Sequence, residues 1–115
     1  MAEDCLFCRI VAGDIPSSRV HEDDEVIAFR DIAPRAPTHI LVIPRRHIGS
    51  AADLTEADGQ LLGRLFAVTA AVAREQGIAD AGYRIISNVG RWGGQTVDHL
   101  HLHLMGGRAF DWPPG

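Results

Sequence analysis

Residues 98–105 read DHLHLHLM, so three histidines alternate with three leucines. Side chains point to alternate faces of a β-strand, and this period places the leucines on one face and the histidines on the other. The leucines are the natural core face, because leucine is among the residues that folding buries most often. The histidines occupy the opposite face and are free for chemistry.

Four further segments rich in branched apolar and aromatic residues are typical of strands. They lie at residues 19–21, 26–30, 39–44 and 83–88, and the histidine-rich segment at 99–105 makes a fifth. Short turns join the first segments, which favours antiparallel neighbours.

One long helix is predicted to begin at Thr55. Thr55 can cap the first turn, Asp58 stands at the capping-box position, and apolar residues then recur at helical spacing as far as Val72. Gly77 is a natural end for this helix. A shorter N-terminal helix is predicted over residues 6–12. Consecutive strands with one long helix predict an α+β fold built on a five-stranded antiparallel sheet.

The length of the chain, 115 residues, is typical of one domain, and we expect a single domain over residues 1–115. A net charge of −4 with scattered arginines argues against a nucleic-acid partner. No apolar run approaches the roughly 20 residues that cross a bilayer. The acidic start MAEDCLF is unlike a secretory signal, so we expect a cytoplasmic protein without membrane contact.

Cys5 and Cys8 form a CxxC motif. In a reducing cytoplasm we expect thiols here and no structural disulfide. Two thiolates at this spacing commonly bind zinc, and the ion then takes about two more ligands. Because the chain has no third cysteine, the candidates are His21, His39, His47 and the three histidines of residues 99–103. The alternative is a pair of small buried thiols in a short helix.

We favour His47 and His99 as the other two zinc ligands. His47 follows PRR just past the end of a predicted strand, and an outer histidine of the 99–103 run can approach it from a neighbouring strand. At about 3.3 Å per residue, the outer two histidines of that run lie about 13 Å apart at Cα. One zinc ion can therefore hardly bind all three.

His101 and His103 are then left for chemistry. A neutral imidazole is abundant near pH 7 and can attack phosphorus without a separate base, while its neighbour protonates or positions an oxygen of the same group. Residues 93–96 precede this strand and offer backbone N–H groups to phosphate oxygens, together with the hydroxyl of Thr96. No GK[ST] sequence follows, so the loop is not a Walker A motif.

The run from His99 to Met105 follows the pattern His-φ-His-φ-His-φ-φ, where φ is apolar, and resembles the motif of the histidine triad (HIT) family. The similarity extends over CLFCRIVAGDIPSSRVHEDDEVIAFRDIAPRAPTHILVIPRRHI at 5–48, GGQTVDHLHLHLMGG at 93–107 and the terminal WPPG. The ending and the short length resemble the Hint branch. The resemblance implies a HIT-type α+β fold whose sheet becomes continuous in a homodimer.

Several prokaryotic HIT proteins hold zinc through such a CxxC, a histidine after a PxxH turn and the first triad histidine, and the chain is similar to them. The resemblance thus implies one structural zinc on the ligands favoured by the spacing. Leu6 and Phe7 lie between the two cysteines, so we expect zinc to fix one wall of the purine pocket.

For function, the resemblance implies hydrolysis or transfer at the α-phosphate of a purine nucleotide. Hint-type enzymes cleave the P–N bond of purine nucleoside phosphoramidates, such as adenosine 5′-monophosphoramidate or lysyl-AMP, through a covalent AMP-histidine. Their nucleophile is the middle histidine, which corresponds to His101. His103 and His39 correspond to the other catalytic histidines, and Thr96 to a hydroxyl that is commonly serine. Because no carboxylate cluster for Mg²⁺ is apparent, we expect activity without added divalent cation.

A nucleotide pocket is implied as well. Asp31 corresponds to the carboxylate that binds the ribose hydroxyls, and Asn88 to a polar contact near the phosphate. The implied nucleotide-binding residues are Leu6, Phe7, Ile10, Phe29, Asp31, Ile32, Asn88, Gly94, Gln95, Thr96, His101 and His103. Arg30 stands where histidine is common, so the resemblance assigns it no role. Trp112 corresponds to an aromatic that the partner subunit presents to the leaving group.

Two other functions remain open. Cleavage of dinucleoside polyphosphates needs the same nucleophile and a different pocket for the leaving group. A nucleotide-binding scaffold dimer would retain the pocket, and its hydrolysis would be incidental.

Overall fold

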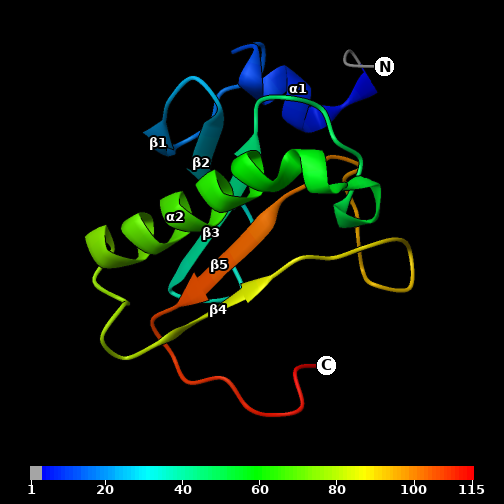
Figure 1. Ribbon diagram of the computed structural model, residues 1–115. Coiled ribbons are helices and arrows are strands. Elements are labelled where there is room, and N and C mark those ends of the chain that lie inside the picture. The colour runs from blue at the N-terminus through cyan, green and yellow to red at the C-terminus, as the bar shows by residue number, and fades with distance from the viewer. Residues whose placement is uncertain (1–3) are drawn as a thin grey trace.

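Five antiparallel strands and two helices make up the structure, a computed structural model that describes residues 4–115. The elements follow in the order α1 (Leu6–Val11), β1 (Arg19–Glu22), β2 (Val26–Arg30), β3 (Thr38–Pro44), two 3₁₀ turns (Ala51–Asp53 and Glu56–Asp58), α2 (Gly59–Glu75), β4 (Tyr83–Ile86) and β5 (Leu102–Gly106). The strand order is β1-β2-β3-β5-β4, as Figure 1 shows. The predicted α+β fold is confirmed.

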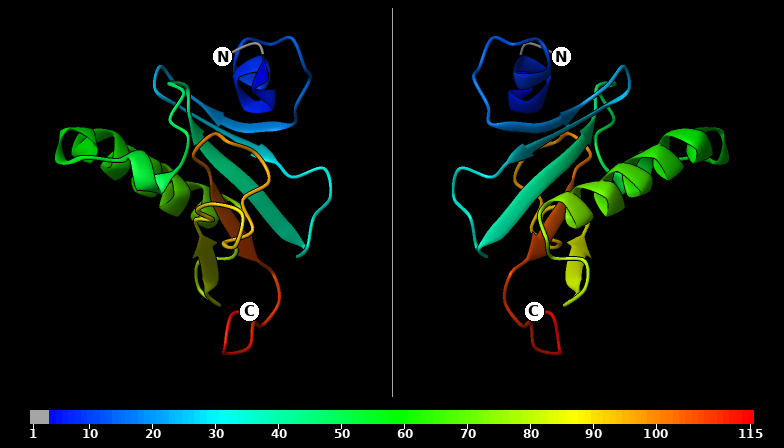
Figure 2. Two further views of the ribbon diagram at one scale, coloured as in Figure 1. Left: turned by 90° about the vertical axis from the view of Figure 1, so that its right-hand side faces the viewer. Right: turned by 90° about the vertical axis from the view of Figure 1, so that its left-hand side faces the viewer.

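The two helices lie on opposite sides of the sheet (Figure 2). Because side chains in β2 and β3 alternate between the two faces, these strands contribute apolar residues to both sides. The side that packs under α2 takes Val26, Ala28, Ile40 and Val42, together with Leu100, Leu102 and Leu104. The side that packs under α1 takes Ile27, Phe29, Leu41 and Ile43. All seven residues of β3 are buried, which suits a central strand covered on both faces.

The long helix begins with the capping box that the sequence predicts. The Thr55 side chain accepts from the N3 backbone, and the Asp58 carboxylate accepts from the Thr55 N–H at 3.0 Å. The first turn is a 3₁₀ turn, however, and the α-helix proper starts at Gly59. Gly77 follows the helix with φ of 74°, a left-handed conformation that glycine adopts without strain. Among residues 4–115 no helix has the length and apolar character to cross a bilayer.

The predicted strand at 99–105 is wrong at its start, because β5 begins only at Leu102. Val42 pairs with Leu102, and the same register would set Leu100 opposite Pro44. Proline has no N–H for the ladder, and the Leu100 N–H donates to the carbonyl of Ile48 at 2.6 Å instead. The alternation of side chains nevertheless continues, since Leu100 remains in the core under α2.

The strand predicted at 83–88 is shorter for a related reason. β4 ends at Ile86, which pairs with His103, the second residue of β5. Beyond this pair β5 offers almost no further partner, so the chain leaves the sheet before Asn88. The loop from Asn88 to His101 therefore has no regular ladder, although it carries many of the predicted site residues.

Candidate active site and metal centre

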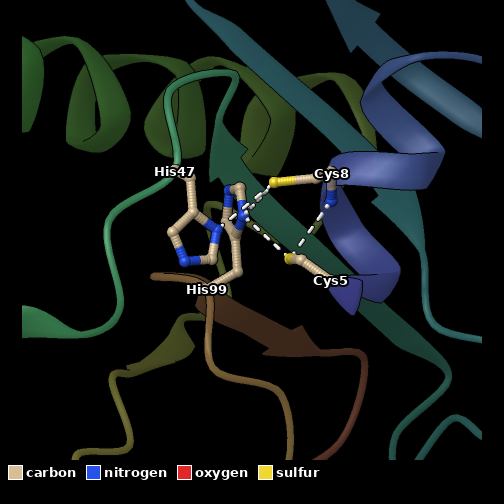
Figure 3. Close-up of side chains that lie close together, drawn as sticks. All are labelled: Cys5, Cys8, His47 and His99. Atoms are coloured by element: carbon tan, nitrogen blue, oxygen red, sulfur yellow. Dashed lines mark hydrogen bonds between the residues drawn. The ribbon is translucent and has the colours of Figure 1, made fainter. Parts of the chain in front are cut away.

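Cys5, Cys8, His47 and His99 meet at one point, although three separate parts of the chain supply them (Figure 3). Their ligand atoms all lie within 4.8 Å of one another. The sulfur to Nδ1 distances are 3.4 Å from Cys5 to His99, 3.2 Å from Cys8 to His47 and 3.5 Å from Cys8 to His99. A tetrahedral zinc with ordinary bond lengths would separate sulfur from nitrogen by about 3.5 Å. The four side chains, called the metal cluster below, therefore fit an ion such as zinc.

Hydrogen bonds to the backbone orient two of the possible metal ligands, Cys5 and His99. Cys5 caps the N-terminus of α1, and its sulfur accepts from the Cys8 N–H at 3.3 Å. His99 is fully buried, and its Nε2 lies 2.8 Å from the carbonyl oxygen of Pro44. A carbonyl only accepts, so Nε2 carries the ring proton and Nδ1 is bare toward the thiols. Burial lowers the pKa of His99 and keeps the imidazole neutral, as a metal ligand must be.

The thiols of the metal cluster are free, and one of them is held protonated by its surroundings. Burial, and after it the neighbouring Cys5 side chain, raises the pKa of Cys8 to about 11. A nearby cation reverses this preference, because a thiol that coordinates a metal loses its proton. Cys8 is thus poorly suited to stand as a free thiolate and suited to binding a cation.

His101 faces a different cavity, with its ring orientation set by the backbone. Its Nδ1 lies 2.7 Å from the carbonyl oxygen of His99, so Nδ1 donates and Nε2 of the neutral ring is bare. The side chain is 5% exposed, and Phe7 packs edge-on against it at 5.1 Å between ring centroids. A bare imidazole nitrogen in a fixed orientation is what a nucleophile requires.

His103 has the opposite tautomer, and the reason lies on β3. The backbone N–H of Arg35 donates to Nδ1 of His39 at 3.0 Å, so this nitrogen carries no proton. The proton of the neutral His39 ring is then on Nε2, which lies 2.9 Å from Nδ1 of His103. His103 accepts at Nδ1 and therefore carries its own proton on Nε2. The two neighbouring histidines thus provide one acceptor and one donor.

The electrostatic environment agrees with neutral rings. Burial, followed by the neighbouring His101 and His39 rings, lowers the pKa of His103 to about 4. Burial also lowers the pKa of His39, opposed by the nearby Asp31 carboxylate. Asp31 lies 3.5 Å from Nε2 of His39 through Oδ2, while its Oδ1 accepts from the N–H of Ala33 at 2.8 Å. One oxygen of Asp31 therefore holds the turn that follows it, and the other faces His39. Asp31, His39 and His103 are called the catalytic cluster below.

A cavity of about 290 Å³ lies over His101 and His103. It takes in nine of the twelve residues that the family resemblance implies, namely Leu6, Phe7, Ile10, Phe29, Asp31, Ile32, Thr96, His101 and His103. Besides Arg30, five residues that the sequence did not single out also line it, namely Ile15, Pro16, Ser17, Leu41 and Val97. Leu41 could have been found, because it shares a face of β3 with His39. No local pattern identifies the other four, which reach the cavity from loops.

Three of the implied nucleotide residues do not line this cavity and hold the loop before the triad instead. Asn88 donates to the carbonyl of Gly93 at 2.7 Å. Gln95 accepts from the N–H of Gly90 at 2.9 Å and donates to the carbonyl of Gly49 at 2.7 Å. Gly94 takes φ of 82° in the turn between them. These contacts fold the loop that ends at Thr96, which does line the cavity.

Two other residues singled out in the sequence have structural partners. Arg30 is among the residues that line the cavity, yet its guanidinium donates to the side chain of Gln76 at 2.9 Å. His21, one of the candidate metal ligands, lies 2.7 Å from the carboxylate of Asp23 through Nε2 and is not part of the metal cluster.

Comparison with known proteins agrees with this geometry. The family model described as "HIT domain" matches residues 12–110. The chain belongs to the HIT family. Cys5 and Cys8 precede the matched part of this HIT protein, so half of the metal cluster lies outside the family model.

Two similar proteins are the purine nucleoside phosphoramidase of Escherichia coli and an uncharacterised HIT-like protein of Synechococcus elongatus. The first is 51% identical over 108 residues, which are 94% of this chain and 91% of the relative. The second is 49% identical over the full length of both chains. Among solved structures, the HIT family hydrolase of Legionella pneumophila superposes with a TM-score of 0.95 at 48% identity, covering 96% of this chain and 99% of that one.

Proposed function

We propose that this HIT protein hydrolyses the P–N bond of purine nucleoside phosphoramidates through a covalent AMP intermediate on His101. The observation that carries the proposal is the pair of opposite tautomers in one cavity: a bare Nε2 on His101 and a protonated Nε2 on His103. A nucleophile and a hydrogen-bond donor side by side suit a phosphorus centre that must be attacked and have its charge stabilised. The 51% identity to a purine nucleoside phosphoramidase supports the substrate class.

In the first half-reaction Nε2 of His101 attacks the α-phosphorus and the P–N bond breaks. Nδ1–H continues to donate to the carbonyl of His99, which stabilises the positive charge that the ring gains. Nε2–H of His103 donates to a phosphate oxygen, while the departing amine takes up one proton, which a neighbouring imidazole receives from solvent and passes on. In the second half-reaction water attacks the same phosphorus, the P–N bond to His101 breaks, and AMP leaves while one proton of the water returns to solvent.

The apolar part of the cavity is the proposed site of the purine. Phe7, Ile10 and Phe29 are buried and form its wall, and Phe7 and Phe29 contact each other edge to face at 5.5 Å. Asp31 lines the same cavity, and its carboxylate lies 3.5 Å from Nε2 of His39; we assign it to the ribose hydroxyls. Leu6 and Ile32 border the opening with exposed side chains.

We propose one structural zinc per chain on the metal cluster. When bound, the ion supplies the positive charge that holds the two thiolates and ties the start of α1 to the segment before β5. Phe7, which lies between the cysteines, belongs to the purine wall, and the carbonyl of His99 orients His101. The metal cluster therefore supports two sides of the cavity without taking part in the chemistry. Catalysis needs no magnesium.

We further propose that residues 1–115 form a single HIT domain that acts as a cytoplasmic homodimer. Among residues 4–115, β4 lies at one edge of the sheet and has β5 as its one neighbour, so its other edge suits pairing with a second sheet. Trp112, near the end of the chain, is 83% exposed. An exposed tryptophan of this kind suits contact with a partner subunit or with the leaving group of a substrate there.

The test is a comparison of substrates in magnesium-free buffer. We expect adenosine 5′-monophosphoramidate to be turned over with a much higher kcat/KM than a dinucleoside polyphosphate. Rapid quenching and mass spectrometry should detect AMP attached to the peptide that contains His101, and none in His101→Ala. Preference for the polyphosphate, strict dependence on magnesium, or the absence of any covalent adduct would contradict the proposal.

A further inference from the structure

The segment that follows β5 closes onto the loop between β2 and β3, residues 31–37, called the β2–β3 loop below. Gly107 has φ of 87°, and a Cβ placed on it would lie 2.8 Å from Cβ of Pro37. The next residue, Arg108, donates to the carbonyl oxygen of Arg35 from Nε at 3.3 Å and from Nη2 at 3.1 Å. One turn of backbone thus packs against the loop and also holds it by a forked pair of hydrogen bonds.

Arg35 is the residue whose backbone N–H determines the His39 tautomer. Its carbonyl and its N–H belong to successive peptide planes, and only φ and ψ of Arg35 separate them. Fixing the carbonyl therefore restricts where the N–H points. From Arg35 the bonds continue through His39 to Nδ1 of His103, so the position of an exposed arginine is connected to the proton on a cavity-facing nitrogen.

A second arginine provides a matched comparison. Arg84 and Arg108 both stack on the ring of Phe110, at 5.0 and 4.2 Å from guanidinium carbon to ring centroid. Arg84 donates to the carbonyl of Asp111 and so also fastens the C-terminal segment. Neither of these two contacts is with the β2–β3 loop. The two arginines share the aromatic contact and differ in the bond to Arg35.

We infer that Arg108 is a positioning residue for catalysis: by holding the Arg35 carbonyl it maintains the tautomer of His39, and through it the donor nitrogen of His103. The catalytic consequence rests on the proposed function. In that reaction the loss of this restraint weakens stabilisation of the phosphate in the transition state more than binding of the nucleotide. Arg108 is not among the residues that line the cavity.

The experiment uses the full chain with the substitutions Arg108→Ala, Arg108→Lys and Arg84→Ala. Long-range ¹H–¹⁵N correlation spectra distinguish a bare imidazole nitrogen from a protonated one. We expect His39 in the wild type to have bare Nδ1 and protonated Nε2. In Arg108→Ala we expect a mixture of the two tautomers, whereas Arg84→Ala keeps the wild-type pattern. Arg108→Lys, which retains a donor, should restore most of it.

Kinetics with adenosine 5′-monophosphoramidate give the second measurement. Arg108→Ala should lower kcat by about tenfold, the effect of one weakened hydrogen bond, with KM within about twofold of the wild type. An unchanged His39 spectrum in Arg108→Ala, or the same spectral change in Arg84→Ala, would overturn the inference. The spectra need no substrate, so a wild type that fails to turn over the phosphoramidate would refute the proposed function while the spectra still decide the role of Arg108.

Discussion

The metal cluster and the catalytic cluster each gather three or more possible metal ligands within 4.8 Å of one another, yet hydrogen bonds prepare them for different chemistry. In the metal cluster a carbonyl lies behind His99, so the proton stays on the outer nitrogen and the inner one is bare. In the catalytic cluster a backbone N–H lies behind His39, so the outer nitrogen is bare and the inner one carries the proton. The bare inner nitrogen of His99 favours binding of a cation. The protonated inner nitrogen of His39 instead donates a hydrogen bond to His103.

The contrast teaches that the polar group behind an imidazole decides what the ring can do. Both clusters contain histidine with acidic or sulfur neighbours, so residue composition alone does not separate them. A carbonyl can only accept and an amide N–H can only donate, and each enforces one tautomer of a neutral ring. His101 lies between the two clusters and is oriented by the carbonyl of His99, itself a member of the metal cluster.

The largest expected effect comes from removing the residue between the clusters. His101→Ala should lower kcat for adenosine 5′-monophosphoramidate by a factor on the order of 10⁴ or more, because no other group replaces the nucleophile. Steady-state kinetics and circular dichroism should show lost activity in a folded protein. His21→Ala makes the same substitution at a histidine outside both clusters and should retain activity. Comparable losses in both variants would contradict the assignment.

Loss of the metal comes next. Cys8→Ser, or chelation of the wild type, should remove the ion and lower the free energy of unfolding by about 3 kcal/mol or more, because metal binding is coupled to folding. Elemental analysis and thermal unfolding measure the two quantities. Zinc should restore the stability of the chelated wild type and magnesium should not. If chelation removes no metal, or leaves stability and nucleotide affinity unchanged, the metal cluster is misassigned.

A substitution in the catalytic cluster should lower activity and leave the metal content unchanged. His39→Ala removes the donor that places the proton on His103, and we expect kcat to fall by about 10²-fold, within the range of general acid–base groups. Its metal content should equal that of the wild type, because His39 does not belong to the metal cluster. Elemental analysis together with kinetics tests whether the two clusters have separate roles. Loss of zinc in His39→Ala would contradict that.

A smaller effect is expected on stability at acidic pH. The pKa of His103 in the folded protein is about 4, below the unfolded value of about 6.5. The unfolded chain therefore takes up this proton first, and stability present above pH 6.5 is lost as the pH falls toward 4. Because His103 is only partly buried, solvent reduces this effect. We expect the acid-induced loss in the free energy of unfolding to be smaller by about 1 kcal/mol in His103→Asn. Chemical denaturation at several pH values measures the difference, and parallel curves would contradict it.

The sequence predicted the fold correctly, and it also predicted that Cys5, Cys8, His47 and His99 lie together. Its errors have physical causes. The bounds of β2 match the prediction, because a central strand produces a local apolar run. The start of β5 does not, since it depends on the missing N–H of Pro44, a residue on another strand. The cavity residues Ile15 to Ser17 were missed because a loop that borders a cavity has no periodic pattern.

What the sequence determined by itself is the division of labour along residues 99–103. A period of two separates leucines from histidines, and the spacing prevents one ion from binding all three imidazoles. The tertiary structure alone decided which nitrogen of each outer ring carries the proton. The partner of His99 is the carbonyl of Pro44, and that of His103 is the ring of His39. Both lie on β3, and folding brings them within hydrogen-bond distance of residues that are 55 and 64 positions away in the sequence.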